Sequence, residues 1–250
     1  MINYIKILSA GLLLITTTAD AGYTNIRFAS EIYPPFTSQH IDKELQGFDI
    51  DVAKALCKII DAKCTFSNEK FSDMIPSLKN RKYDAWINAI TITEERQKEI
   101  SFSKPYFATK AMLIATNNTL FNAAPAEISG KTIGVGEHTC YIQYLKETYN
   151  DMIKIKIFSD KDAPLIALEK GEVDAVIDDD QTLKHLRASQ KDPKKYRLIN
   201  LPAKYKQLIW HEYGIAVAKD NVELIRVLNH ALDHLKDEGT IKKLIKKHFH

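Results

Sequence analysis

The stretch LKNRKYDAWI, at residues 78–87, has a counterpart in LEKGEVDAVI at residues 168–177. In each stretch the end of a helix leads through a turn that finishes in Asp-Ala into a short apolar strand, and each follows an earlier predicted strand and helix. The sequence therefore predicts two units of βαβαβ type, one in each half of the chain. Because ligands bind beyond the carboxyl ends of the strands in open parallel sheets, the residues after the two stretches are candidates for a binding site.

The residues that follow the two stretches differ in charge. The first stretch leads into Asn88, Ala89, Thr91 and, one short turn later, Arg96, whereas the second leads into Asp178, Asp179 and Asp180. One half thus offers a cation that can bind a carboxylate, and the other offers carboxylates that can bind an ammonium group. We predict a cleft for an amino acid between the two halves.

The composition is that of an exported globular protein. The 250 residues are 45% hydrophobic and 27% charged, which fits one or two domains. The first 21 residues have the pattern of a secretory signal: Lys6 precedes an apolar run at 7–15, and an A-x-A cleavage site lies at 19–21. That run is too short to cross a bilayer, which takes about 20 residues.

Nucleic-acid and nucleotide binding are not indicated. The formal net charge is only +3, and the lysines of IKKLIKKHFH at 241–250 alternate with apolar residues at helical spacing, which is typical of a solvated helix face. A nucleic-acid surface would need a concentrated basic stripe with aromatic residues. The segment SGKTIGVG at 129–136 lacks the spacing of a phosphate-binding loop. We expect no cofactor.

Three cysteines raise the questions of a disulfide and of a metal site. Cys57 and Cys64 lie seven residues apart, where a predicted helix turns into a strand, and export favours a disulfide between them. Two buried thiols are the alternative. Cys140 is left over, and His138 beside it would supply only a second ligand, so we predict no metal site.

Two crossings of the chain divide it into lobes. The apolar segment AMLIAT at 111–116 predicts the first crossing, and the region of YGIAVAKD at 213–220 predicts the second. After a signal peptide at 1–21, we therefore expect a discontinuous lobe 1, made of 22–112 and 214–250, and a lobe 2 at 113–213. In lobe 1 a helix begins at GFDID, where we interpret Asp49 and Asp51 as residues that cap the helix and offset its dipole, with a ligand role as the alternative.

Four segments carry a family resemblance: IRFASEIYPPF at 26–36, GFDIDVAKALCKIIDAKCTFSNEKF at 47–71, IPSLKNRKYDAWINAITITEERQKEISFSKPY at 75–106 and YGIAVAKDN at 213–221. They resemble the periplasmic polar amino-acid-binding proteins of ABC importers, and within them the arginine and lysine/arginine/ornithine binders. The resemblance implies an α/β chain with the type II periplasmic binding protein fold, whose two lobes close on the ligand. It also implies a monomeric periplasmic protein that delivers its ligand to a membrane permease.

The resemblance assigns the ligand α-carboxylate to Arg96, whose planar guanidinium can donate two parallel hydrogen bonds. A surface ion pair in the charged run around it is the alternative role for Arg96. Thr139 and Cys140 match a second-lobe segment at a helix start, where free backbone amides favour a carboxylate.

The α-ammonium group is assigned to Asp179, with the Thr91 hydroxyl and the Ala89 carbonyl completing its shell. Asp178 or Asp180 can exchange roles with Asp179, because three consecutive aspartates leave the register open by one residue. A solvated acidic turn is the remaining interpretation of this triplet.

The side chain of a basic ligand is assigned to Glu31, with Tyr33 and Phe71 as aromatic walls. One residue separates Glu31 from Tyr33 where relatives have two, and Asn88, Ala89 and Cys140 replace hydroxyl residues of the family. These departures leave the order among arginine, lysine, ornithine and histidine open.

We therefore expect a binding protein for a basic amino acid, arginine first, and not an enzyme. The main rival is an enzyme on the same fold, because the family includes cyclohexadienyl and arogenate dehydratases. Such an enzyme needs a general acid directed at a leaving group, whereas the predicted cleft offers charges of both signs for a zwitterion. A sensory module is a second rival, and it would normally be fused to a membrane helix or a kinase.

Overall fold

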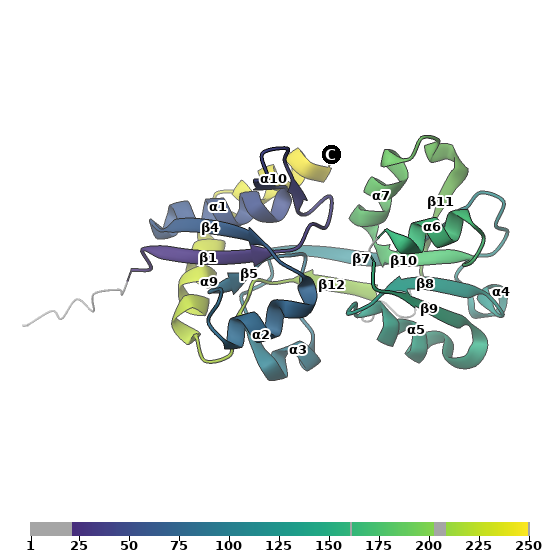
Figure 1. Ribbon diagram of the computed structural model, residues 1–250, viewed down its shortest axis with the longest axis horizontal. Coiled ribbons are helices and arrows are strands. Elements are labelled where there is room, and N and C mark those ends of the chain that lie inside the picture. The colour runs from purple at the N-terminus through teal and green to yellow at the C-terminus, as the bar shows by residue number, and fades with distance from the viewer. Residues whose placement is uncertain (1–21, 161, 203–208, 250) are drawn as a thin grey trace, which may run out of the picture.

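A computed structural model describes residues 22–160, 162–202 and 209–249. The predicted signal peptide at 1–21 lies outside the described residues. Figure 1 shows two lobes side by side, with strands running from one into the other. This is the predicted α/β architecture of two lobes joined by two crossing strands.

Lobe 1 is built on a five-stranded sheet with the order β4-β1-β5-β13-β6. Its strands are β1 (Asn25–Ser30), β4 (Lys63–Asn68), β5 (Ala85–Trp86), β6 (Ile100–Phe102) and β13 (Ala216–Ala218). A short hairpin of β2 (Ser38–Gln39) and β3 (Leu45–Gln46) precedes the first helix. Strand β1 is parallel to both β4 and β5, and β13 runs antiparallel to β5 and β6.

The helices of lobe 1 cover both faces of this sheet. They are α1 (Phe48–Ile60), the 3₁₀ turn η1 (Phe71–Asp73), α2 (Met74–Lys79), α3 (Glu94–Glu99), α9 (Val222–Asp237) and α10 (Thr240–Phe249). Residues of α1, α9 and α10 share one core with β1, and residues of α2 contribute to the core on the opposite face. In α10, Ile241 is buried while the four lysines are exposed, so the predicted solvated lysine face is confirmed.

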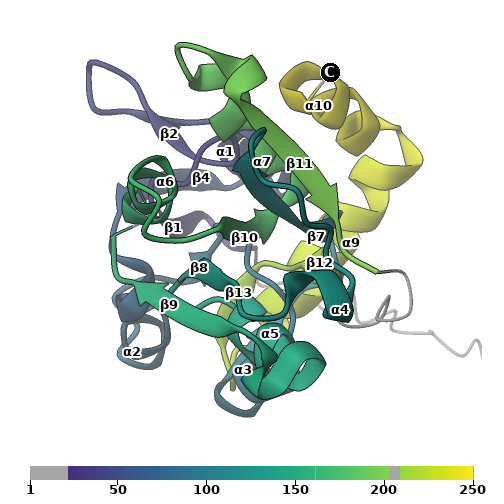
Figure 2. The same cartoon turned by 90° about the vertical axis from the view of Figure 1, so that its right-hand side faces the viewer.

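Lobe 2 is built on a sheet with the order β11-β7-β10-β8-β9. Its strands are β7 (Phe107–Thr116), β8 (Thr132–Gly136), β9 (Lys154–Phe158), β10 (Ala175–Asp179) and β11 (Tyr196–Asn200). Its helices are α4 (Pro125–Ile128), α5 (Tyr141–Tyr149), η2 (Asn150–Met152), α6 (Ala163–Glu169), α7 (Asp180–Ser189) and η3 (Pro193–Lys195). Figure 2, viewed from the lobe 2 end, shows α5 on one side of the sheet and α6 and α7 on the other.

The two predicted repeat units have the same topology. In lobe 1 the chain runs β1-α1-β4-α2-β5, and in lobe 2 it runs β8-α5-β9-α6-β10. In both units the first strand lies between the other two and is parallel to each of them. The predicted βαβαβ repeat is therefore confirmed, and the strands that end the two units, β5 and β10, both lead into the junction between the lobes.

The lobes are joined by a two-stranded ribbon of β7 and β12 (Trp210–Tyr213), which pairs 210–213 with 107–110. Phe107, at the start of β7, belongs to the core of lobe 1, whereas Ala111 belongs to that of lobe 2. The expected lobe boundaries, 112/113 and 213/214, lie at or just beyond the ends of this ribbon. Within the described residues, no helix combines the length and the apolar character needed to cross a membrane.

Candidate ligand-binding site

A cavity of about 670 Å³ lies between the lobes. Nine of the ten predicted ligand-binding residues line it: Glu31, Tyr33, Phe71, Asn88, Ala89, Thr91, Arg96, Thr139 and Cys140. The tenth, Asp179, is fully buried and is not part of the lining, whereas its neighbour Asp178 is. The fold thus brings together residues that lie up to 182 positions apart in the sequence, from Glu31 to Tyr213.

Arg96 is fixed at the lobe 1 side of the cavity by a short capped helix. The Thr93 hydroxyl accepts a hydrogen bond from the Arg96 amide at 3.2 Å and so caps α3. The guanidinium donates to the Thr91 carbonyl and, across the cavity, to the His138 carbonyl, both at 2.8 Å, and it lies 5.2 Å from the centre of the Phe71 ring.

Arg96 lies near no neutralising carboxylate in the part of the chain that the structure describes. Among the described residues no carboxylate forms an ion pair with it, so the predicted alternative of a surface ion pair is wrong. Burial lowers the pKa of Arg96 from its usual range, but a guanidinium stays protonated at neutral pH. An unpaired, largely buried guanidinium is a ready receptor for a carboxylate.

The opposite wall of the cavity is the start of α5 in lobe 2. The Thr139 hydroxyl donates to the Gly136 carbonyl at 2.9 Å, and Cys140 directly precedes the helix. The Cys140 thiol lies 3.7 Å from the Thr91 hydroxyl and 3.8 Å from both ring nitrogens of His211.

Burial keeps the thiol and the imidazole neutral. It raises the pKa of Cys140, and burial together with the charge of Arg96 lowers the pKa of His211 to about 4. The pair therefore lacks the thiolate that nucleophilic chemistry needs. Across the part of the chain that the structure describes, no three His, Cys, Asp or Glu side chains gather closely enough to hold a metal ion.

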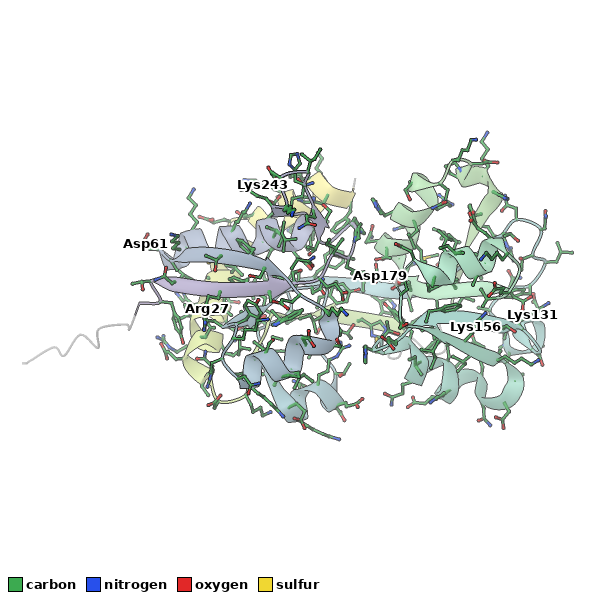
Figure 3. All side chains as sticks on the ribbon, viewed as in Figure 1. Arg27, Asp61, Lys131, Lys156, Asp179 and Lys243 are labelled. Atoms are coloured by element: carbon green, nitrogen blue, oxygen red, sulfur yellow. A yellow bond between two sulfur atoms is a disulfide. The ribbon has the colours of Figure 1, made fainter. Side chains whose placement is uncertain are left out.

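Asp178 and Asp179 end strand β10 at the junction of the lobes, where Figure 3 labels Asp179. Asp179 caps α7, because its Oδ1 accepts from the amides of Gln181 and Thr182 at 3.0 and 2.9 Å. The Tyr33 hydroxyl reaches across from lobe 1 and lies 2.6 Å from Asp178 Oδ1 and 2.9 Å from Asp179 Oδ2. The two carboxylates therefore form one pair, in which Asp179 is fully buried and the partly exposed Asp178 faces the cavity.

This pair has no cationic partner among the described residues. Burial, followed by the negative charge of Asp179, raises the pKa of Asp178 to about 7, and burial also raises the pKa of Asp179. The third aspartate, Asp180, is used elsewhere, since it accepts from Thr109 at 2.9 Å and pairs with Lys184 at 2.7 Å. An ammonium group would be a suitable ionic partner for Asp178 and Asp179.

Glu31 lies at the lobe 1 end of the cavity, just after β1. Its Oε2 accepts from the Phe71 amide at 3.0 Å, and its backbone carbonyl accepts from the Asn88 side chain at 2.8 Å. No lysine, arginine or histidine forms an ion pair with Glu31 among the described residues. The cavity thus holds a third carboxylate at a fixed place, close to the aromatic ring of Phe71.

Some residues of the site were not predicted from the sequence. Tyr141 and Tyr213 line the cavity, and His211 contacts the Tyr141 ring at 5.3 Å between centres. The prediction that Asp49 and Asp51 cap α1 is wrong, because neither side chain makes a cap hydrogen bond, but both lie in its first turn, where acidic residues offset the helix dipole. Asp51 pairs with Lys247 and His248 of α10, and Asp49 is buried beneath the site.

The predicted disulfide is confirmed. Cys57 in α1 and Cys64 in β4 are bonded, with their Cα atoms 6.2 Å apart, while Cys140 is free. The bond ties the first helix of lobe 1 to the neighbouring strand on the edge of the sheet. It therefore strengthens the lobe that carries Arg96 and Glu31.

Comparisons with known proteins agree with this geometry. The family model of the bacterial extracellular solute-binding proteins, family 3, matches residues 26–250. The ABC transporter arginine-binding protein 1 of Escherichia coli (strain K12) is 36% identical over 241 residues, which is 96% of this chain and 96% of the relative. The lysine/arginine/ornithine-binding periplasmic protein of the same strain is 30% identical over 250 residues, covering 98% and 96%.

The same likeness is found among solved structures. An ancestral arginine-binding protein bound to arginine superposes with a TM-score of 0.79 and 31% sequence identity, over 92% of this chain and 100% of that chain.

Proposed function

Since the chain belongs to family 3 of the bacterial extracellular solute-binding proteins, we propose that it captures a basic L-amino acid in the periplasm, arginine first, and delivers it to the permease of an ABC importer. The charge pattern of the cavity carries this proposal. The Asp178–Asp179 pair and Glu31 provide carboxylates, Arg96 provides one guanidinium, and none of these groups has an ionic partner among the described residues. A ligand with one carboxylate and two cationic groups complements this pattern.

The ligand lies across the junction of the lobes in this proposal. Its α-carboxylate binds Arg96 and the backbone amides of Thr139 and Cys140 at the start of α5. The Thr91 hydroxyl, the Ala89 carbonyl and the Asp178–Asp179 pair then surround the α-ammonium group. Asp178 is the member of the pair that faces the cavity, and Asp179 supports it while capping α7.

The side chain of the ligand extends toward Glu31. Tyr33 and Phe71 provide aromatic surface along its length, and Asn88 holds the Glu31 backbone in place. A guanidinium can donate two parallel hydrogen bonds to a carboxylate, whereas an ammonium group cannot match that fork. This favours arginine over lysine and ornithine, and the relatives named for arginine binding support the same order.

Contacts between the lobes indicate how the ligand closes the cleft. Arg96 of lobe 1 donates to a carbonyl of lobe 2, and Tyr33 of lobe 1 donates to the Asp178–Asp179 pair. A bound zwitterion would replace both contacts with charged ones, so it binds the closed arrangement best and shifts the population toward it. The permease would then recognise the closed protein.

We infer that the chain is not an enzyme. The relatives described above are named as binding proteins, and Arg96, Glu31 and Asp178 each match a charge that a basic amino acid carries. A dehydratase would instead need a general acid directed at a leaving group. Release of an aromatic keto acid from prephenate, or of an aromatic amino acid from arogenate, by the purified protein would contradict this inference.

Calorimetric titration of ligand-free protein tests the proposal. The panel is the twenty standard amino acids with ornithine and citrulline. We expect arginine to bind most tightly, lysine and ornithine more weakly, and glutamate not at all, because its acidic side chain would face Glu31. Binding of an acidic or apolar amino acid in preference to every basic one would overturn the proposed ligand class.

A further inference from the structure

Asp49 is a fully buried carboxylate that the proposed ligand contacts do not use. It lies in the first turn of α1, within the GFDID motif, and has no solvent exposure. Its Oδ2 accepts a hydrogen bond from the backbone amide of Ala89 at 2.7 Å, and its Oδ1 accepts from the Tyr106 hydroxyl at 2.8 Å. These partners lie 40 and 57 residues away in the sequence.

A buried carboxylate without a cation is costly. Among the described residues no lysine, arginine or histidine pairs with Asp49, and burial raises its pKa to about 7. By contrast, Asp51 on the same helix is partly exposed and pairs with Lys247 and His248. Among the described residues, the Asp49 carboxylate is held in the core by these two hydrogen bonds, so the groups that donate them are the next question.

Ala89, the first partner, has an unusual backbone. Its φ angle is 47°, in the left-handed region that residues other than glycine rarely adopt. The segment that contains it follows β5 and lines the cavity with Asn88, Ala89 and Thr91. A strained backbone persists only where its surroundings hold it, and the bond from the Ala89 amide to Asp49 is such a restraint.

Tyr106, the second partner, connects Asp49 to the junction of the lobes. It is almost fully buried, and it directly precedes β7, the first of the two strands that join the lobes. Its own backbone amide donates to the Tyr213 carbonyl at 2.9 Å, at the end of the second joining strand. Asp49 therefore ties the segment that lines the cavity to the start of the ribbon between the lobes.

We propose that Asp49 is a positioning residue for ligand binding: by accepting the Ala89 amide it holds the Ala89 peptide in the orientation that presents its carbonyl to the α-ammonium group of the ligand. This inference rests on the proposed amino-acid site. It gives the GFDID motif a role in ligand recognition rather than in helix capping. It also distinguishes Asp49 from Asp51, whose partners lie on α10.

The test compares Asp49→Asn with Asp51→Asn, the same substitution two positions along the same helix. Each variant is titrated with arginine and with guanidinovalerate, the arginine analogue that lacks the α-amino group. We expect Asp49→Asn to weaken arginine binding about tenfold or more, which is the loss of one charged hydrogen bond. Binding of guanidinovalerate should change less than twofold, since the analogue has no group for the Ala89 carbonyl, and Asp51→Asn should leave both affinities unchanged.

Amide hydrogen exchange of Ala89 provides a measurement that needs no ligand. In the ligand-free wild-type protein and in Asp51→Asn, the Ala89 amide should exchange slowly, and in Asp49→Asn it should exchange faster while the amides of β1 stay protected. If Asp49→Asn does not fold, wild-type exchange still decides the point. An unprotected Ala89 amide there means that the bond to Asp49 is absent, and the inference is overturned.

The remaining outcomes separate this inference from the proposed function. An equal loss of affinity for arginine and guanidinovalerate in Asp49→Asn would assign Asp49 to general stability and overturn the positioning role. If wild-type protein binds another amino acid instead of arginine, the proposed ligand is wrong, and the comparison is repeated with that amino acid and its analogue without the α-amino group. If Asp49→Asn then lost affinity for the amino acid but not for its analogue, that result would support the positioning role independently of the proposed ligand.

Discussion

The two lobes share one topology, but their charged groups at the cavity have different surroundings. In lobe 1 the charged groups of the cavity are held by neutral partners: Glu31 by the Phe71 amide, and Arg96 by the Thr91 carbonyl. In lobe 2 two carboxylates, Asp178 and Asp179, lie side by side, and burial raises the pKa of both. At the cavity, lobe 1 thus offers charges of both signs at fixed places, whereas the two lobe 2 carboxylates beside it have no cationic partner among the described residues.

This difference indicates that the two lobes have different roles in ligand binding. Lobe 1 is arranged for binding before the ligand arrives, and its edge is stiffened by the Cys57–Cys64 disulfide. Lobe 2 gains its counter-charge only when an ammonium group enters, so its carboxylates favour closure only with a ligand present. From lobe 1, the Tyr33 hydroxyl donates to both of these carboxylates.

The largest effect should come from removing the fixed cation of lobe 1. Arg96→Ala should abolish binding of every amino acid while the fold survives, because the variant leaves the ligand carboxylate without its partner. A charged hydrogen bond contributes about 1.5 to 3 kcal/mol, and a bidentate pair more, so we expect affinity to fall more than about a hundredfold. Calorimetry checks this.

Arg81→Ala is the matched control for Arg96→Ala. Arg81 is an exposed arginine of lobe 1 that pairs with Asp220 on the surface, so its removal should leave arginine affinity unchanged. If Arg96→Ala bound arginine within fivefold of wild type, lobe 1 would not contribute the fixed cation, and the comparison of the lobes would fail.

Removing the disulfide tests how much it stabilises lobe 1. Replacing both Cys57 and Cys64 by serine should lower the free energy of unfolding by at most about 3 kcal/mol, because the closed loop is short. Chemical denaturation measures this loss, and arginine affinity at a temperature where the protein stays folded should change little. Alkylation of non-reduced, denatured protein should label one thiol, Cys140, and labelling of three would show that the bond does not form.

The two repeat units and the position of Arg96 could be predicted from the sequence, because the sequence patterns that indicate them are local. The Asp-Ala stretches mark both repeat units, and Arg96 follows the first at a capped helix start. The choice between Asp178 and Asp179 could not be made, since it depends on which face of β10 each side chain takes, and a shift of one residue exchanges the faces. His211 was missed, and Asp49 was assigned first to helix capping, because their partners lie far away in the sequence.

A smaller, selective effect should follow from neutralising Glu31. Glu31→Gln removes the counter-charge of the cationic head but keeps the size of the side chain, so arginine should lose roughly ten- to fiftyfold in affinity while citrulline, which is neutral, loses little. Competition titrations with both ligands give the two ratios. An equal loss for arginine and citrulline would place the cation site elsewhere, with Asp178 as the next candidate.

The smallest effect, a dependence on pH, belongs to lobe 2. The pKa of Asp178 is about 7 in the ligand-free protein, and the α-ammonium group binds its ionised form. Below this pKa the ligand must displace a proton, so arginine affinity should rise about tenfold between pH 6 and pH 8. Calorimetry in paired buffers should show proton release on binding near neutral pH, and Asp178→Asn should abolish most of the dependence.

The stability of the ligand-free protein should change with pH in the opposite direction. Asp178 and Asp49 have a pKa of about 7 in the folded protein and a pKa near 4 when unfolded. Between these values the folded state binds more protons than the unfolded state, so its free energy of unfolding falls as pH rises from about 4 to 7. Saturating arginine should remove the share of this decline that Asp178 contributes. If Asp49→Asn removed the whole decline and Asp178→Asn removed none of it, the pKa of Asp178 would not be raised, and the contrast between the lobes would fail.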